Sequence, residues 1–254
     1  MAKVEEIRVG FVDIEAIYDY IEQFPNKTII YDIPFDKGLE VNWDVLKVFK
    51  EKIDLVLCIH DLHLVDLCKT FDFKWFWAYP IITYHELKGI AEMEASYLYI
   101  SAPLTFDLPF VAKYNIPIRV CANVAHEGYV KRKNGITGFF IRPEDISKYE
   151  EYISVIEFKT QELQQERTLH HVYAENGNWP GNLNKLITNL DFDIDNRMIE
   201  DVFADSRIRC RQRCMSGGNC HLCERQFSLI STIRHAYYEE KRKQKEENEN
   251  KEDN

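Results

Sequence analysis

Short apolar runs of strand length recur about every 20 residues through the first 160 residues of the chain. Such runs are typical of buried β-strands when turn-forming residues separate them. The eight predicted strands are Ile7-Val12, Thr28-Ile33, Asp54-Ile59, Lys74-Ala78, Ser96-Ser101, Ile116-Asn123, Ile136-Ile141 and Ser154-Phe158. Between most of them, apolar residues recur at three- and four-residue intervals, as they do in helices packed on one face. The predicted helices are Ile14-Phe24, Trp43-Lys52, Leu62-Phe71, Tyr84-Met93 and Leu108-Tyr114.

Eight parallel strands alternating with helices is the number that closes a TIM-type barrel. We therefore expect an α/β fold in which residues 1–160 form a small or irregular TIM-like (β/α)8 barrel. It should be irregular because the segment Ala125-Asn134 is too short and basic to be a convincing helix. An open doubly wound sheet is the competing architecture, but no glycine-rich phosphate loop follows the first predicted strand.

Polar side chains follow the predicted strands where each apolar run stops. They are Asp13, Asp32, His60, Asp61, Tyr79, Ser101, Asn123, Arg142 and Glu157. In a barrel these residues would share one rim, where enzymes of this fold place their chemistry. The alternative is that strand ends are polar because loops are solvated, with Asp61 capping the next helix.

The rim residues suggest two sets of roles. An imidazole gains or loses a proton near neutral pH, so His60 with Asp32 or Glu157 is the predicted catalytic group. Arg142 could anchor an anionic part of a substrate, and Asn123 and Asp61 could bind its polar groups.

The pattern changes after residue 160, where we expect a helical module over residues 161–242. It contains four of the chain's seven cysteines within the string RCRQRCMSGGNCHLC. These are Cys210, Cys214, Cys220 and Cys223, which are the predicted metal ligands. Residues 243–254 contain no apolar side chain and should be disordered.

Four thiolates can close a tetrahedron around zinc or hold an iron-sulfur cluster. Zinc is the first choice of metal, and His221 is expected to lie outside the coordination sphere because four cysteines already complete it. A tetrathiolate zinc site is closed to water, so any chemistry would then lie elsewhere. The other cysteines, Cys58, Cys68 and Cys121, lie in apolar runs and are expected to be buried, inert thiols.

Composition limits the partners and the compartment. The net charge of -10 argues against nucleic-acid binding through the overall field. A local basic patch, formed by Arg207, Arg209, Arg211 and Arg213, could contact phosphates or offset the charge of the thiolates. No apolar stretch is long enough to span a membrane, and none follows the start MAKVEEIRV, so we expect a cytoplasmic protein.

Two segments, IPIRVCANVAHEGYV and GITGFFIRPEDISKYEEYISVIEF, resemble the collagenase-like peptidase family. The resemblance covers about residues 96–160 and implies a TIM-like barrel, with a four-cysteine iron-sulfur centre and RNA or quinone hydroxylation in several members. Cysteine spacing in this chain differs from the family pattern, so neither cluster type nor activity is transferred. The strings ENGNWPGNLNKLITNL and CMSGGNCHLC look like those of uncharacterised phage and mobile-element proteins.

Two functions fit these patterns. One is a metal-containing enzyme that acts on a small polar molecule or an RNA at the barrel mouth, with the cysteine module beside it. The other is a non-catalytic binding or scaffold protein whose arginine-flanked zinc module contacts a protein or a nucleic acid.

Overall fold

The computed structural model describes residues 6–10, 18, 27–38, 40–101, 104–127, 138–139, 141–146, 149–159, 168–169, 171–173, 179, 181–189, 195–198, 235–236 and 238–244. Contacts divide the chain into two compact units. Unit 1 comprises residues 1–100, 109–120 and 152–155, and unit 2 comprises residues 101–108, 121–151 and 156–254. The predicted domain limits at residues 160 and 242 stay predictions.

The first sheet is parallel and has the strand order β1-β2-β3-β4. Its strands are β1 (Glu6–Val9), β2 (Thr28–Ile33), β3 (Leu55–Ile59) and β4 (Lys74–Trp77). Every residue of β3 is buried, which is why its sequence is apolar throughout and does not alternate with polar residues.

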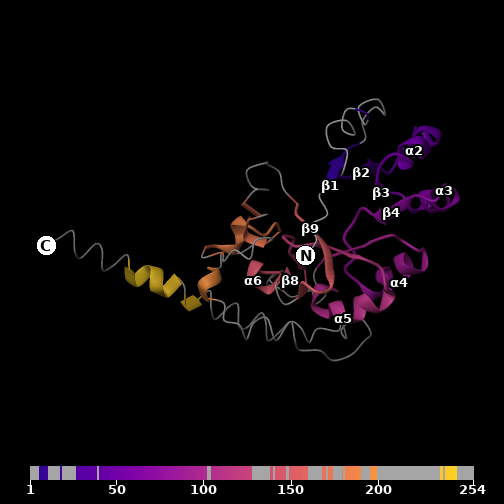
Figure 1. Cartoon of the computed structure of the whole chain (residues 1–254). Helices are drawn as coiled ribbons and strands as arrows, with labels where there is room; N and C mark the ends of the chain where they lie inside the picture. Colours follow the sequence, from indigo (N-terminus) through magenta and orange to yellow (C-terminus); the bar gives the residue numbers. More distant parts are fainter. Residues whose placement is uncertain are drawn as a thin grey trace. The chain divides into compact units, whose positions relative to one another are not determined.

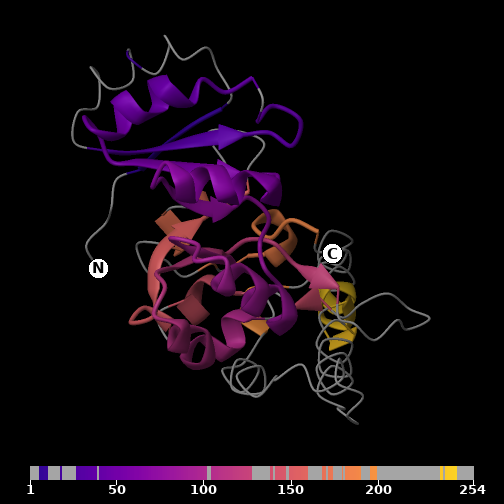
Figure 2. The ribbon, with the colours of Figure 1, turned by 90° about the vertical axis from the view of Figure 1, so that its right-hand side faces the viewer.

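Helices follow three of these strands. They are α2 (Trp43–Lys50), η1 (Leu62–Leu64) with α3 (Val65–Thr70), and α4 (Tyr84–Glu92). Figure 1 and Figure 2 show α2, α3 and α4 arranged in succession beside the strands. Leu46 and Phe49 of α2 and Leu87 and Ile90 of α4 are buried, as their spacing predicts.

The second parallel sheet has the order β5-β6-β9. Its strands are β5 (Leu98–Ile100), β6 (Ile118–Cys121) and β9 (Ile153–Glu157). Short helical turns η2 (Leu104–Asp107), α5 (Leu108–Val111) and η3 (Ala112–Tyr114) connect β5 to β6. Further short elements are β7 (His126–Glu127), β8 (Gly138–Phe139), α6 (Pro143–Ile146), η5 (Leu183–Lys185) and η6 (Asn196–Met198).

The prediction of a TIM-like (β/α)8 barrel is wrong. All eight predicted strands overlap observed strands, but in the described part of the chain they pair as separate sheets and not as one ring. The seventh strand explains part of the difference, because β8 pairs antiparallel with β7. About ten residues separate these two short strands, whereas a parallel crossover needs a dozen or more.

Candidate functional site

A polar cluster lies toward the carboxyl ends of β2, β3 and β4 in unit 1. Asp32 of β2 and Cys58 of β3 are direct partners in the parallel register. His60 follows Cys58 by two residues and therefore points to the same face of the sheet. Backbone hydrogen bonds from His60 N to Ile33 O (3.2 Å) and from Ala78 N to Ile59 O (3.0 Å) continue the ladder into these strand ends.

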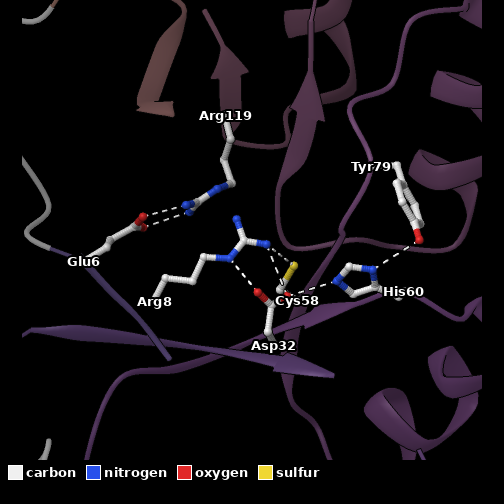
Figure 3. Close-up of polar contacts among 7 residues, drawn as sticks. All are labelled: Glu6, Arg8, Asp32, Cys58, His60, Tyr79 and Arg119. Carbon is white, nitrogen blue, oxygen red and sulfur yellow. Dashed lines mark hydrogen bonds and ion pairs between the residues drawn. The ribbon is translucent and has the colours of Figure 1, made fainter. Parts of the chain in front are cut away.

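Arg8 of β1 completes one side of the cluster (Figure 3). Its Nε donates to Asp32 Oδ2 at 2.7 Å, and its Nη2 donates to Asp32 Oδ1 at 3.2 Å and to Cys58 Sγ at 3.0 Å. A guanidinium that grips a carboxylate with two donors fixes its orientation as well as its charge. Asp32 thus contacts both Arg8 and His60, and its Oδ1 atom is shared between them.

His60 links Asp32 to Tyr79, which follows β4. The His60 Nε2 atom lies 3.1 Å from Asp32 Oδ1, and its Nδ1 atom lies 3.3 Å from the Tyr79 hydroxyl (Figure 3). An ionised carboxylate only accepts hydrogen bonds, so Nε2 carries the proton in this contact. In a neutral imidazole Nδ1 is then the acceptor, and the Tyr79 hydroxyl donates to it.

Asp32 is ionised in this environment. Burial acts to raise the pKa of Asp32, but the hydrogen bonds from Arg8 and Cys58, the Arg8 charge and the His60 hydrogen bond outweigh it. The pKa of Asp32 consequently lies below its ordinary value. The carboxylate can therefore hold the His60 tautomer and stabilise an imidazolium when one forms.

The cluster runs from a buried thiol to a partly exposed tyrosine. Tyr79 is 49% exposed, whereas Cys58 is fully buried. The Tyr79 ring also packs edge-on against Trp77, with 5.2 Å between centroids. Tyr79, which ends the chain of hydrogen bonds, is thus a partly solvent-exposed residue.

Three groups in the cluster are of kinds that bind metals. Ligand atoms of Asp32, Cys58 and His60 lie within 4.8 Å of one another, and zinc uses carboxylate, thiolate and imidazole ligands. Arg8, however, already donates to Asp32 and Cys58, so a positive charge faces these two ligands. The contact between Asp32 and His60 is also at direct hydrogen-bonding distance. The geometry therefore favours a hydrogen-bonded centre over a metal centre.

The structure brings the predicted residues Asp32 and His60 into contact, and their role in catalysis stays a prediction. Asp61 instead accepts a hydrogen bond from His63 N at 2.9 Å and caps η1, as the alternative explanation expected. Its role in substrate binding stays a prediction.

The other residues predicted to bind substrate or take part in catalysis are Glu157, Asn123 and Arg142, which belong to unit 2, whereas Asp32 and His60 belong to unit 1. Asn123 is buried and exchanges two 2.8 Å hydrogen bonds with the backbone of Lys159. Arg142 is also buried and forms two 3.0 Å hydrogen bonds with Asp145. The predicted roles of all three residues in substrate binding or catalysis stay predictions.

The four predicted metal ligands and the four flanking arginines lie outside the described residues. The expected zinc or iron-sulfur centre and the expected contact with nucleic acid or protein are therefore predictions from the sequence alone.

Sequence reasoning missed Arg8 and assigned no polar contact to Cys58. A charged residue inside the apolar strand Ile7-Val12 was the available signal for Arg8, because a strand places such a residue on a definite face. For Cys58 the signal was its two-residue spacing from His60. The expected burial of Cys58 is confirmed, although its thiol has polar partners.

A cavity of about 580 Å³ lies elsewhere in unit 1, toward the amino ends of β3 and β4. Its charged lining is paired: Lys50 with Asp72, Lys69 with Glu94, and Lys74 with Asp54. Parallel strands place their two ends at opposite edges of a sheet, so this cavity is separate from the polar cluster. The cluster and not the cavity carries hydrogen-bonded groups suited to proton transfer.

Comparisons with models of protein families, with curated proteins and with solved structures each gave no match. The resemblance to the collagenase-like peptidase family thus stays a prediction. Within the described residues, no helix combines the length and the apolar character needed to cross a bilayer.

Proposed function

We propose that this chain is an enzyme that catalyses proton transfer on a small polar substrate at the polar cluster. The observation that carries this proposal is the continuous hydrogen-bonded chain from Asp32 through His60 to Tyr79. A carboxylate, an imidazole and a phenol joined by hydrogen bonds are groups that general acid–base catalysis uses. Ligands of parallel sheets also bind outside the carboxyl ends of the strands.

The three side chains have distinct roles in this proposal. The Tyr79 oxygen takes a proton from the substrate while its own hydroxyl proton passes to His60 Nδ1. One proton leaves the substrate and one is gained by the imidazole, so the step is balanced. Asp32 remains ionised and stabilises the imidazolium, which is the function of the buried carboxylate in a Ser-His-Asp triad.

Arg8 contributes by holding Asp32. Its two donors oppose the effect of burial and help to hold the pKa of Asp32 below its ordinary value, and only an ionised carboxylate can stabilise an imidazolium. Arg8 is thus a positioning residue for Asp32.

The proposal can be tested before the substrate is known. The purified chain is first screened by NMR against 2-oxo acids, 2-hydroxy acids, amino acids and sugar phosphates, with the His60 and Tyr79 resonances observed. Compounds that perturb them are then incubated with the protein in D₂O, and mass spectrometry detects deuterium at their acidic C–H positions. Exchange above the protein-free rate is expected.

The matched variants are Tyr79→Phe, which removes one oxygen, and His60→Gln. Each should lower the exchange rate about 100-fold or more, which is the usual contribution of a positioned acid or base. Tyr114→Phe is the control, because Tyr114 belongs to η3 and loses the same atom. The proposal would be rejected if the compounds that bind took up deuterium equally fast with wild type and with both variants. Tight binding of added Zn²⁺ at Asp32 and His60 would also reject it, since the cluster would then be a metal centre.

A further inference from the structure

A second ion pair occupies the same strand as Arg8, two residues away. Glu6 accepts hydrogen bonds from Arg119 Nη1 at 2.8 Å and from Nη2 at 2.6 Å. Arg119 comes from β6, and its side chain is only 1% exposed. Glu6 and Arg8 lie on one face of β1, because side chains two residues apart in a strand point the same way.

Arg119 also has a fixed position of its own. Its guanidinium lies over the rings of Phe76, at 4.6 Å, and Tyr97, at 5.2 Å. Phe76 is the register partner of Cys58, so Arg119 packs on the face of the sheet that carries the polar cluster. A buried guanidinium held by two aromatic rings is a rigid reference point for β1.

The two ion pairs together select one register of β1. A slip by two residues in one direction would put Arg8 where Glu6 is, against Arg119. A slip by two residues in the other direction would put Glu6 where Arg8 is, against Asp32. Either slip brings like charges together, and a one-residue slip turns every side chain to the opposite face.

We infer that the Glu6–Arg119 ion pair fixes the register of β1 and thereby places Arg8 against Asp32 and Cys58. Glu6 and Arg119 are then positioning residues for the polar cluster (Figure 3). Their importance for catalysis rests on the proposed function, whereas their effect on register does not.

The Glu6–Arg119 ion pair joins β1 to a strand of another sheet, so it can fix the register of β1 independently of the pairing with β2. β1 has four residues and pairs with β2 along one edge. In the described part of the chain β2 is the strand that pairs with β1, and a short edge strand has few backbone contacts to fix its register. A buried charge pair is best supported as a device that specifies register, and it is weak evidence for stability.

The test measures Arg8 directly. In protein labelled with ¹⁵N-arginine, the hydrogen-bonded Nε–H of Arg8 should exchange slowly with solvent. The double variant Glu6→Gln/Arg119→Met removes both charges, so no unpaired buried charge remains to prevent folding. In this variant the Arg8 Nε–H and the β1 amides should exchange with solvent at least about tenfold faster than in wild type.

Two further variants make the test specific. Asp54→Asn/Lys74→Met removes a 2.7 Å ion pair on strand ends of the same sheet without touching β1, and it should leave Arg8 exchange unchanged. Arg119→Lys keeps the charge opposite Glu6 and should stay within about threefold of wild type.

Unchanged Arg8 exchange in the Glu6→Gln/Arg119→Met protein would overturn the inference. The inference would also be overturned if Arg8 exchanged as fast in Arg119→Lys as in the double variant, because the charge at residue 119 would then not set the register. No substrate is needed for this readout. A released Arg8 with unaltered substrate exchange would therefore reject the proposed function and leave the register inference intact.

Discussion

Asp32 and His60 are 28 residues apart in sequence and 3.1 Å apart between Oδ1 and Nε2. They meet because β2 and β3 are parallel neighbours whose carboxyl ends share one edge of the sheet. Arg8 of β1 donates hydrogen bonds to the same carboxylate. The negative charge of Asp32 therefore faces both a permanent cation and an imidazole. These two contacts make Asp32 important for both stability and the proposed chemistry.

Asp32→Asn should lower the free energy of unfolding at pH 7 by about 1–3 kcal/mol, because Arg8 loses a charged acceptor. The pKa of Asp32 is lowered in the folded state, so its contribution is present above the ordinary carboxyl pKa. That contribution is lost as the pH falls through the lowered pKa. The difference between wild type and variant should thus shrink below about pH 4.

Urea unfolding at pH 7 and at pH 3 measures this difference. Asp44→Asn is the control, because it removes the ion pair of Asp44 with Lys47 at a side chain that is 90% exposed. A stability difference for Asp32→Asn that is equal at both pH values would contradict the assignment of an ionised, paired Asp32.

The reactivity of Cys68 should be low in the folded protein. Burial raises the pKa of the Cys68 thiol to about 12, so almost none of it is thiolate at pH 8. Iodoacetamide should therefore leave Cys68 unmodified under native conditions and alkylate it fully in urea, as peptide mass spectrometry would show. Complete native labelling within minutes would be inconsistent with the burial of Cys68 in α3.

Helix α4 begins with a capping box, in which Glu86 N donates to Thr83 Oγ1 at 3.1 Å and Thr83 N donates to Glu86 Oε2 at 3.1 Å. Thr83→Ala should destabilise unit 1 by about 0.5–2 kcal/mol. In thermal unfolding, Thr83→Ser should lose much less stability than Thr83→Ala, because serine retains the capping hydroxyl. Equal effects of the two substitutions would show that the methyl group and not the cap matters.

The cysteine-rich segment is predicted to contain about one equivalent of zinc per chain. Elemental analysis after anaerobic purification should find it, and Cys214→Ser and Cys220→Ser should lower the content. Cys68→Ala, which changes a buried free thiol, should not. Brown protein containing iron and labile sulfide would establish the cluster alternative, and metal-free protein would refute the predicted site.

The sequence predicted the part of the site that depends on local rules. Asp32, His60 and Tyr79 each follow an apolar run, and parallel neighbouring strands bring such residues together without any further information. Strand positions were predictable for the same reason, since β2 coincides with its predicted range Thr28-Ile33.

Closure of the sheet was not predictable in this way. It depends on which strand pairs with which over long sequence distances, and strand count alone does not determine that. The antiparallel pairing of His126 with Phe139 shows how one short connection changes the topology. Roles assigned to Glu157, Asn123 and Arg142 relied on a common rim, and the contacts of Arg142 with Asp145 depend on packing that no strand pattern encodes.

The most direct test of the proposed proton-transfer centre is the ¹⁵N NMR spectrum of the His60 ring nitrogens near neutral pH, in wild type and in Asp32→Asn. We predict that neutral His60 carries its proton on Nε2, with Nδ1 accepting from Tyr79, and that Asp32→Asn alters this distribution. A proton on Nδ1, or a tautomer mixture that Asp32→Asn leaves unchanged, would contradict the hydrogen-bonded chain on which the proposed function depends.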